Sequence, residues 1–107
     1  MKKIPKDIIE KMKSYPEFYK KVWTACFKIS VGKTLTYKRL AEKIGSPKAA
    51  RAVALALSKN PFAPIIPCHR VIRSDGTLGG YSGTGGIKKK LEMIKYERQT
   101  RKNASLD

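Results

Sequence analysis

The stretch that decides the fold is TYKRLAEKIGSPKAARAVALALS, residues 36–58. Its first half predicts a short helix over residues 37–44, because Thr36 can cap it and apolar residues recur at helical spacing. Gly45 follows at the position where helices often end in a left-handed residue. We expect the apolar residues of this helix to face the core: Leu40, Ala41 and Ile44.

A second helix is predicted directly after this glycine. Ser46 can cap it and Pro47 suits its first position, so we expect an alanine-rich helix from Pro47 to about Ser58. Two short helices joined by a short turn that contains glycine form a helix-turn-helix. The motif is common in proteins that bind DNA, and by itself it is only moderately specific for that function.

Two further helices are predicted upstream of this motif. The first is short and has apolar residues at helical spacing, namely Ile4, Ile8, Ile9 and Met12. The second runs from about Tyr15 to Lys28, since residues 14–17 resemble a capping box with proline in the first turn. Its apolar residues form two adjacent stripes, which are Phe18, Val22, Cys26 and Tyr19, Trp23, Phe27. This broad surface indicates core packing, so we interpret Cys26 as a small buried apolar residue and Trp23 as core.

The region downstream contains few helix signals until its last third. Residues 65–73 are rich in β-formers, but Pro67 excludes a central strand there. Residues 74–77, Ser-Asp-Gly-Thr, predict a turn. A last helix is expected from about Ile87 to Arg98, followed by a loose tail over residues 99–107. The apolar face of that helix would be Ile87, Leu91 and Ile94.

The predicted elements define a mainly α fold with a few short strands. A chain of 107 residues fits a single domain with one modest core. We therefore expect one domain over residues 1–107, with residues 1–14 as a helical extension.

The charge of the chain indicates a polyanionic partner. Lys and Arg number 24 against 8 Asp and Glu, which gives a formal net charge of +16. Nucleic acid is the first candidate partner and an anionic membrane surface the second, while charge that serves only solubility stays open. No apolar run approaches the ~18 residues that a membrane span needs, and the N-terminus lacks the apolar block of a signal peptide. We expect a cytoplasmic protein that does not bind membranes.

Three familiar motifs are incomplete in this sequence. Residues 32–34, Gly-Lys-Thr, resemble the end of a phosphate-binding loop, but Phe27 stands where that loop requires glycine. The glycine-rich residues 79–86 do not follow a strand and open a helix as in a dinucleotide-binding unit. A zinc site needs about four ligands, and Cys26, Cys68 and His69 do not supply them, so we expect no metal.

The adjacent pair Cys68 and His69 remains as candidate chemistry. A thiol reacts as its thiolate, and a nearby imidazole in positive surroundings can favour that form. Adjacency in sequence alone favours the interpretation that the pair is incidental, because neighbouring side chains need not contact each other. The longer run Ile66-Pro67-Cys68-His69-Arg70-Val71-Ile72, however, closely resembles the active-site segment of the O6-alkylguanine-DNA alkyltransferases. The resemblance extends from about Pro16 to Glu97 and implies the winged-helix-like helix-turn-helix fold of the family's C-terminal domain.

The resemblance implies a role for individual residues of this chain. Cys68 matches the alkyl acceptor, and His69 matches the general base that acts on it through a water molecule. Glu97 matches the carboxylate that orients this histidine, and Tyr37 matches the tyrosine that donates a proton to the departing guanine. Asn60 matches an asparagine that ties the recognition helix to the active-site segment.

A second set of residues is implied to contact the DNA and the flipped base. The recognition helix of the family enters the minor groove, and the damaged guanine is rotated out of the stack. Arg51 matches the arginine that fills the vacancy. The other residues implied to contact DNA are Tyr37, Ser46, Lys48, Ala49 and Ala50. Those implied to line the base pocket are Pro67, Val71, Tyr81 and Ser82.

The activity implied is DNA repair in a single turnover. The partner would be double-stranded DNA with O6-alkylguanine, the protein would act as a monomer, and no cofactor would be needed because the lesion donates the alkyl group. One alternative is an alkyltransferase-like protein that binds the lesion and flags it for excision repair, although such proteins lack the acceptor cysteine. Another is a helix-turn-helix regulator, which gives no reason for Cys68, His69 and Glu97 together.

Overall fold

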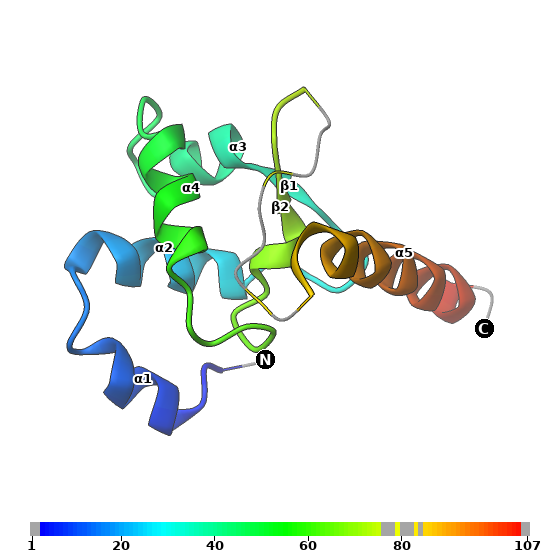
Figure 1. Cartoon of the computed structure of the whole chain (residues 1–107), viewed down its shortest axis with the longest axis horizontal. Helices are drawn as coiled ribbons and strands as arrows, with labels where there is room; N and C mark the ends of the chain where they lie inside the picture. Colours follow the sequence, from blue (N-terminus) through cyan, green and yellow to red (C-terminus); the bar gives the residue numbers. More distant parts are fainter. Residues whose placement is uncertain (1–2, 76–78, 80–82, 84, 106–107) are drawn as a thin grey trace.

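The computed structural model describes residues 3–75, 79, 83 and 85–105, the last five by their backbone alone. Most of the described chain is helical, as predicted (Figure 1). The helices are α1 (Lys6–Met12), α2 (Glu17–Phe27), α3 (Tyr37–Lys43), α4 (Ala50–Ser58) and α5 (Gly86–Ser105), with a 3-10 helix η1 (Cys68–Arg70). The strands are β1 (Leu35–Thr36) and β2 (Val71–Ile72).

The helix-turn-helix consists of α3 and α4. The Thr36 side chain accepts a hydrogen bond of 3.0 Å from the Arg39 backbone N–H, which confirms the predicted cap. Gly45 has φ +79°, and the backbone bonds from Gly45 N to Glu42 O (3.1 Å) and from Ser46 N to Ala41 O (2.9 Å) close the end of α3. The left-handed glycine therefore turns the chain towards α4.

The start of α4 differs from the prediction. The helix begins at Ala50 instead of Pro47, and the Ser46 side chain does not cap it. The reason is that the Ser46 carbonyl accepts from the Ala49 N–H at 2.9 Å and closes a separate turn before the helix. Residues 46–49 consequently form a connecting turn on the approach to α4.

The helical start predicted near Tyr15 is also wrong by two residues. The α2 helix begins at Glu17, with Pro16 in extended conformation at ψ 148° as its cap residue. A residue that precedes proline is disfavoured in helical conformation, which keeps Tyr15 outside the helix. The Ser14 hydroxyl donates to the Lys11 carbonyl at 3.1 Å at the end of α1, so it forms no capping box with α2.

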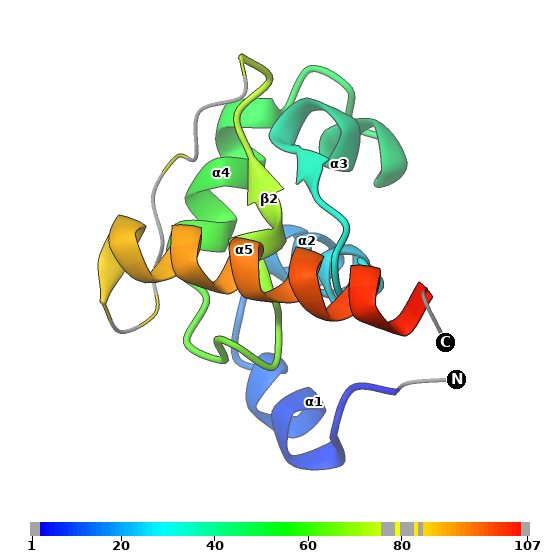
Figure 2. The ribbon, with the colours of Figure 1, turned by 90° about the vertical axis from the view of Figure 1, so that its right-hand side faces the viewer.

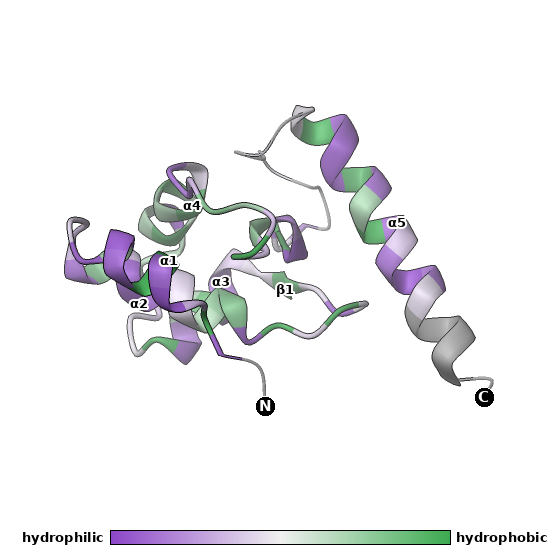
Figure 3. Ribbon diagram, turned by 90° about the horizontal axis from the view of Figure 1, so that it is seen from below, coloured by the Kyte–Doolittle hydropathy of each residue, from purple (hydrophilic) through white to green (hydrophobic). Residues whose placement is uncertain are grey.

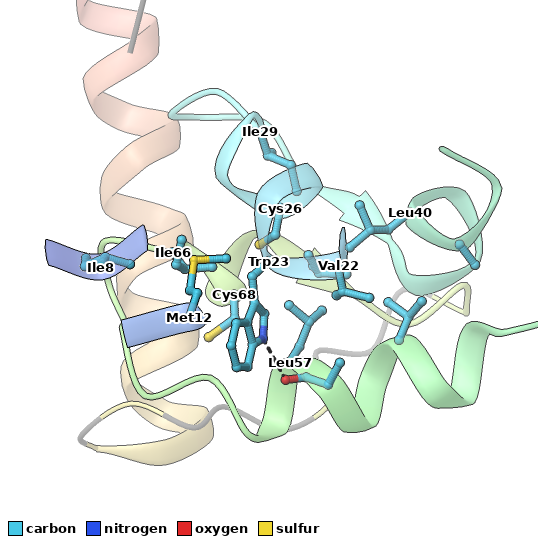
Figure 4. Packing of buried hydrophobic residues seen from close by; sticks show 14 residues of the cluster. Ile8, Met12, Val22, Trp23, Cys26, Ile29, Leu40, Leu57, Ile66 and Cys68 are labelled. Carbon is cyan, nitrogen blue, oxygen red and sulfur yellow. Dashed lines mark hydrogen bonds between the residues drawn. The ribbon is translucent and has the colours of Figure 1, made fainter. Parts of the chain in front are cut away.

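The core lies where α2 packs against α3 and α4 (Figure 4). The Trp23 indole N–H donates to the Ala56 carbonyl at 2.9 Å, which ties α2 to α4 inside the protein. Cys26 and Trp23 are fully buried, as predicted from their stripes. The other fully buried apolar residues of the cluster are Val22, Leu40, Ala41, Val53, Ala56, Ile66 and Val71.

The two strands are shorter than the β-rich run predicted over residues 65–73. Only Val71 and Ile72 are strand, and they pair in parallel with Leu35 and Thr36. Residues 68–70 form η1 instead, which the prediction missed. In the turn before η1, the Ile66 carbonyl accepts a hydrogen bond from the Cys68 N–H at 2.8 Å. The backbone is bent too tightly there to form a strand. The strand pair places the segment after Cys68 beside the start of α3.

Helix α5 runs across η1 and β2 and extends past the rest of the molecule at its C-terminal end (Figures 1 and 2). Its predicted apolar face is wrong, because Ile87 is 57% and Leu91 39% exposed while Ile94 alone of the three is buried. The buried side of α5 instead includes Lys90, whose ammonium group donates a hydrogen bond to the Val71 carbonyl. Polar and apolar residues therefore alternate around α5 without one apolar stripe (Figure 3).

The tail predicted as loose from residue 99 is helical as far as Ser105. No glycine or proline interrupts residues 99–105, and the Thr100 hydroxyl donates to the Tyr96 carbonyl at 3.0 Å. None of the helices in the described part of the chain combines the length and the apolar character that crossing a membrane requires.

We expect Gly45→Ala to lower the free energy of unfolding by about 1–2 kcal/mol, because an L-residue is strained at positive φ. No atom lies within 4 Å of an added Cβ, so the loss arises from backbone conformation alone. Urea denaturation measures it. Gly45→Asn is the control and should lose less, since asparagine tolerates this conformation; equal losses for both variants would contradict the account.

Candidate active site

Cys68 opens η1 and is 4% exposed. Two backbone bonds shape this segment, from Cys68 N to Ile66 O at 2.8 Å and from Arg70 N to Pro67 O at 2.9 Å. Short 3-10 turns of this kind send successive side chains in different directions. The thiol of Cys68 and the ring of His69 therefore leave the same tight turn in different directions, and both are buried.

His69 is held by a carboxylate of α5, which lies 28 residues further along the chain. Its Nε2 lies 2.9 Å from Glu97 Oε2, and the ring is 1% exposed. A carboxylate only accepts hydrogen bonds, so Nε2 carries the proton of this contact and Nδ1 is the ring atom with a lone pair. The geometry fixes both the orientation and the tautomer of the histidine.

Arg70 holds the same carboxylate from the other side. Its Nε donates to Glu97 Oε1 and its Nη2 to Glu97 Oε2, each at 2.8 Å. A third bond runs from Arg70 Nη1 to the Ile29 carbonyl at 2.7 Å. One guanidinium thus joins α5 to the end of α2, and the two-pronged contact keeps the Glu97 carboxylate in one orientation.

The electrostatics favour a neutral histidine beside a charged carboxylate. Burial lowers the pKa of His69 below its ordinary value of 6.5, although Glu97 opposes this effect. Burial acts to raise the pKa of Glu97, but the hydrogen bonds from Arg70 and His69 outweigh it and hold the pKa below its usual value. A neutral, oriented imidazole near pH 7 is suited to accept a proton.

Lys90 is a buried cation that the sequence analysis did not single out. Its Nζ donates to the Val71 carbonyl at 2.7 Å, lies 3.4 Å from the Tyr37 hydroxyl and 5.7 Å from the centre of the Tyr37 ring. Burial lowers the pKa of Lys90 to about 8, while the neighbouring Cys68 acts in the opposite direction. Burial also raises the pKa of Tyr37, so its hydroxyl stays protonated. A proton donor and a titratable cation therefore lie next to each other.

A small cavity of about 100 Å³ opens beside Cys68. Tyr37 forms one wall, and Gly79 approaches so closely that an added Cβ would lie 2.7 Å from the Tyr37 hydroxyl. A side chain at position 79 would displace that hydroxyl, so the position next to Tyr37 requires glycine for steric reasons. The remaining lining residues are Ala54, Leu57, Ser58, Cys68 and Arg73.

Asn60 joins the end of α4 to the segment that leads to Cys68. Its Nδ2 donates to the Ile66 carbonyl at 2.9 Å, and its Oδ1 accepts from the Phe62 N–H at 2.9 Å. The side chain is 3% exposed, so both bonds are made away from solvent. A buried amide bonded in this way resists rearrangement, because an unpaired buried polar group is costly.

The residues implied to contact DNA gather at the start of α4. Arg51 is exposed on its first turn, and Lys48 is exposed in the turn before it. Ser46, Ala49 and Ala50 are half-buried there. Tyr37 lies at the start of α3 and reaches the cavity of Cys68, so it belongs to both regions.

Of the four residues implied to line the base pocket, the structure describes two. Tyr81 and Ser82 lie outside the described residues. Val71 and Pro67 are buried next to Cys68 but are not among the lining residues, because the Val71 side chain belongs to the core and its carbonyl accepts from Lys90. Within the described residues, no group of three metal-ligating side chains gathers.

Three functional candidates were missed in the sequence. Lys90 lies seven residues before Glu97, so both occupy one side of α5, and this spacing was an available signal. Arg70 directly follows His69. Arg73 carried no signal, since only the folded chain brings it to the cavity of Cys68.

Comparison with known proteins identifies related sequences and structures. Residues 17–99 match the model of the 6-O-methylguanine DNA methyltransferase, DNA binding domain family. A methylated-DNA--protein-cysteine methyltransferase of Methanosarcina barkeri is 55% identical over 81 residues, which cover 76% of this chain and 50% of that protein. The chain thus spans about half the length of this relative.

Solved structures with the same fold include two bound to DNA. OGT of Mycobacterium tuberculosis in complex with DNA has a TM-score of 0.76 and 45% identity, covering 79% of this chain and 52% of that one. Atl1 of S. pombe, in complex with damaged DNA containing O6-carboxymethylguanine, has a TM-score of 0.64 and 33% identity. Here 76% of this chain and 75% of the other are covered.

We expect Glu97→Gln to lower the free energy of unfolding at pH 7 by on the order of 1–3 kcal/mol, because Arg70 and His69 lose their charged partner. The pKa of Glu97 is depressed, so its stabilisation is present above the ordinary value of 4.5 and is lost as pH falls through the folded value. Urea denaturation at pH 7 and below 4.5 measures the change. Glu92→Gln, at an exposed position of the same helix, is the control; a pH-independent difference for Glu97→Gln would contradict the account.

Proposed function

Because the chain belongs to the 6-O-methylguanine DNA methyltransferase family, we propose that it repairs DNA by moving an alkyl group from O6-alkylguanine to Cys68. The observation that carries this proposal is the arrangement around one thiol. Cys68 lies at a cavity shared with Tyr37 and next in sequence to His69, which Glu97 orients. The nucleophile and the base are thus neighbours on one 3-10 turn, the acid comes from the start of α3, and the carboxylate that orients the base comes from α5.

The proposed DNA contact is made by the start of α4 and the turn before it. Lys48 and Arg51 are exposed there, and the net charge of +16 favours binding to phosphates regardless of base sequence. A helix presenting small residues can approach the minor groove closely, and Ala49 and Ala50 precede Arg51. We propose that Arg51 takes the place of the flipped base, which enters the pocket because O6 is unreachable inside a duplex.

The transfer begins with the Cys68 proton. His69 takes it through a water molecule, because Nε2 is engaged by Glu97 and Nδ1 has the lone pair. The thiolate then attacks the alkyl carbon, a C–S bond forms, and the bond from that carbon to O6 breaks. The electron pair of the broken bond passes to the guanine. A thioether is not readily hydrolysed, so each molecule reacts once.

The departing guanine receives a proton from Tyr37. A neutral base leaves more easily than an anion, which is the reason for an acid at this position. The tyrosinate left behind lies 3.4 Å from Lys90 Nζ, and the pKa of about 8 allows this ammonium to replace the lost proton. His69 returns its proton to solvent and Lys90 regains one, so the reaction consumes no net proton.

No cofactor is required, because the lesion itself supplies the alkyl group. We propose that the protein acts as a monomer on double-stranded DNA in the cytoplasm. Tyr81 and Ser82 would close over the base.

A lesion-binding role without transfer is the second candidate, since Atl1 of S. pombe is matched over 75% of its length and is bound to damaged DNA. Cys68 distinguishes the two functions: a thiol beside a base and an acid serves transfer, and recognition alone does not require it.

Mixing the protein with duplex DNA that contains O6-methylguanine should add one methyl mass to the Cys68 peptide at a 1:1 limit. Mass spectrometry after proteolysis measures the modified position. Cys68→Ser should abolish transfer, while Cys26→Ser is the matched control and should retain it, because burial raises the pKa of Cys26 and keeps it a thiol. Binding without any methyl transfer would support the lesion-flagging function instead.

Tyr37→Phe should slow methyl transfer by about 10²-fold, the usual contribution of a general acid. Single-turnover rates measured by rapid quenching test this, with Tyr19→Phe as the control.

Lys90→Met should slow transfer as well, and its effect should largely vanish in the Tyr37→Phe background, because the proposed role of Lys90 acts through that hydroxyl. Additive losses in the double variant would contradict the shared proton path.

A further inference from the structure

A second basic surface lies away from the proposed active site. A groove of about 820 Å³ is formed by α2, the turn that follows it, β1 and the end of α3. Its lysines come from all of these parts except β1. They are Lys20, Lys21, Lys28, Lys33 and Lys43, and we call this surface the lysine groove.

The charges of the lysine groove are largely unneutralised. Glu17 is the acidic residue among those that line it, and it pairs with Lys20 at 2.6 Å. Among the described ion pairs, this one alone involves a lysine of the groove. The other four lysines line the same concave surface without a carboxylate partner among the described ion pairs, which raises the local positive potential.

The groove is separate from the helix proposed to enter DNA. The side of α2 that packs on α4 carries Trp23, whose indole is bonded to the Ala56 carbonyl. At 100° per residue, Thr24 and Lys28 lie about 100° and 140° around the helix from Trp23, and Lys21 lies about 160° away. The lysine groove consequently opens on another side of α2 than the one that α4 covers.

The lining chemistry fits phosphodiester backbone. Lysine ammonium groups act as point charges that tolerate variable phosphate positions, and the exposed hydroxyls of Thr24 and Ser30 lie among them as neutral donors. DNA is also the polyanion that reaches this protein by its proposed function, so other segments of the same nucleic acid are present at high local concentration.

We propose that the lysine groove binds the phosphates of a second stretch of DNA while α4 holds the first. Contact with two segments lets the protein pass directly from one to the other without dissociating into solution. This inference rests on the proposed function only in that α4 is taken to bind DNA. A single-turnover repair protein that must find a rare lesion gains from such direct transfer.

The test measures dissociation from a fluorescently labelled, undamaged 20-base-pair duplex as unlabelled duplex is added. Direct transfer makes the dissociation rate rise with competitor concentration. The groove variant replaces Lys21, Lys28 and Lys33 by glutamine. The control variant replaces Lys6, Lys11 and Lys95, exposed lysines outside the groove, and has the same net charge. Lys43 is kept because α3 adjoins the DNA-contacting turn.

For the parent and the control we expect a clear dependence on competitor. For the groove variant the slope should fall by about tenfold or more, the order expected for three lost phosphate contacts. A parent rate independent of competitor, or equal slopes in the two variants, would overturn the proposal. Acceleration by poly-glutamate but not by duplex DNA would also overturn it, in favour of an acidic protein partner.

Methyl transfer from a damaged duplex, measured with the same three proteins, separates this proposal from the proposed function. Transfer at equal rates in all three, together with the loss of competitor dependence in the groove variant, supports the lysine groove. A parent that transfers no methyl group but still shows competitor-dependent dissociation would contradict the repair activity and leave the groove proposal supported.

Discussion

The Glu97 carboxylate connects the parts of the chain on which the rest of the site depends. It accepts from the His69 ring and from two nitrogens of Arg70, and Arg70 in turn donates to the Ile29 carbonyl at the end of α2. Helix α5, the 3-10 turn of Cys68 and α2 are thereby joined through one cluster. Because the Glu97 side chain is only 14% exposed, water competes weakly for these bonds.

The same helix brings a second polar group into the site. Lys90 is fully buried and bonded to the Val71 carbonyl, so β2 is held against α5 by an ammonium where apolar packing would be the ordinary solution. A buried cation is costly unless it is satisfied, and such groups gather where chemistry requires them. The site is thus assembled by polar contacts between α5 and the active-site segment, while the core of α2, α3 and α4 supplies the rigid support.

The helix-turn-helix and the core were predictable because local rules decide them. Thr36 and Gly45 carry the signals of a helix start and a helix end, and the stripes of α2 place Trp23 and Cys26 in the core. The start of α4 was not predictable, since a turn closed by the Ser46 carbonyl competes with the capping role of its side chain.

The buried side of α5 was predicted wrongly for a physical reason. Hydropathy patterns assume that buried residues are apolar, whereas Lys90 and Glu97 are held inward by partners far away in the sequence. The resemblance to known alkyltransferases named Cys68, His69 and Glu97 as a set, and the structure brings His69 and Glu97 into direct contact. It assigned no role to Arg70 and Lys90, whose partners become their neighbours only when the chain folds.

The central claim is that burial keeps His69 neutral while the Glu97 carboxylate orients its ring, so that it can act as a base. His69 is the one histidine of the chain, so its ring gives a single set of signals in an NMR pH titration. The account predicts a proton on Nε2 at neutral pH and a pKa for His69 below 6.5. A ring protonated on Nδ1 instead, or one that titrates above 6.5, would contradict it.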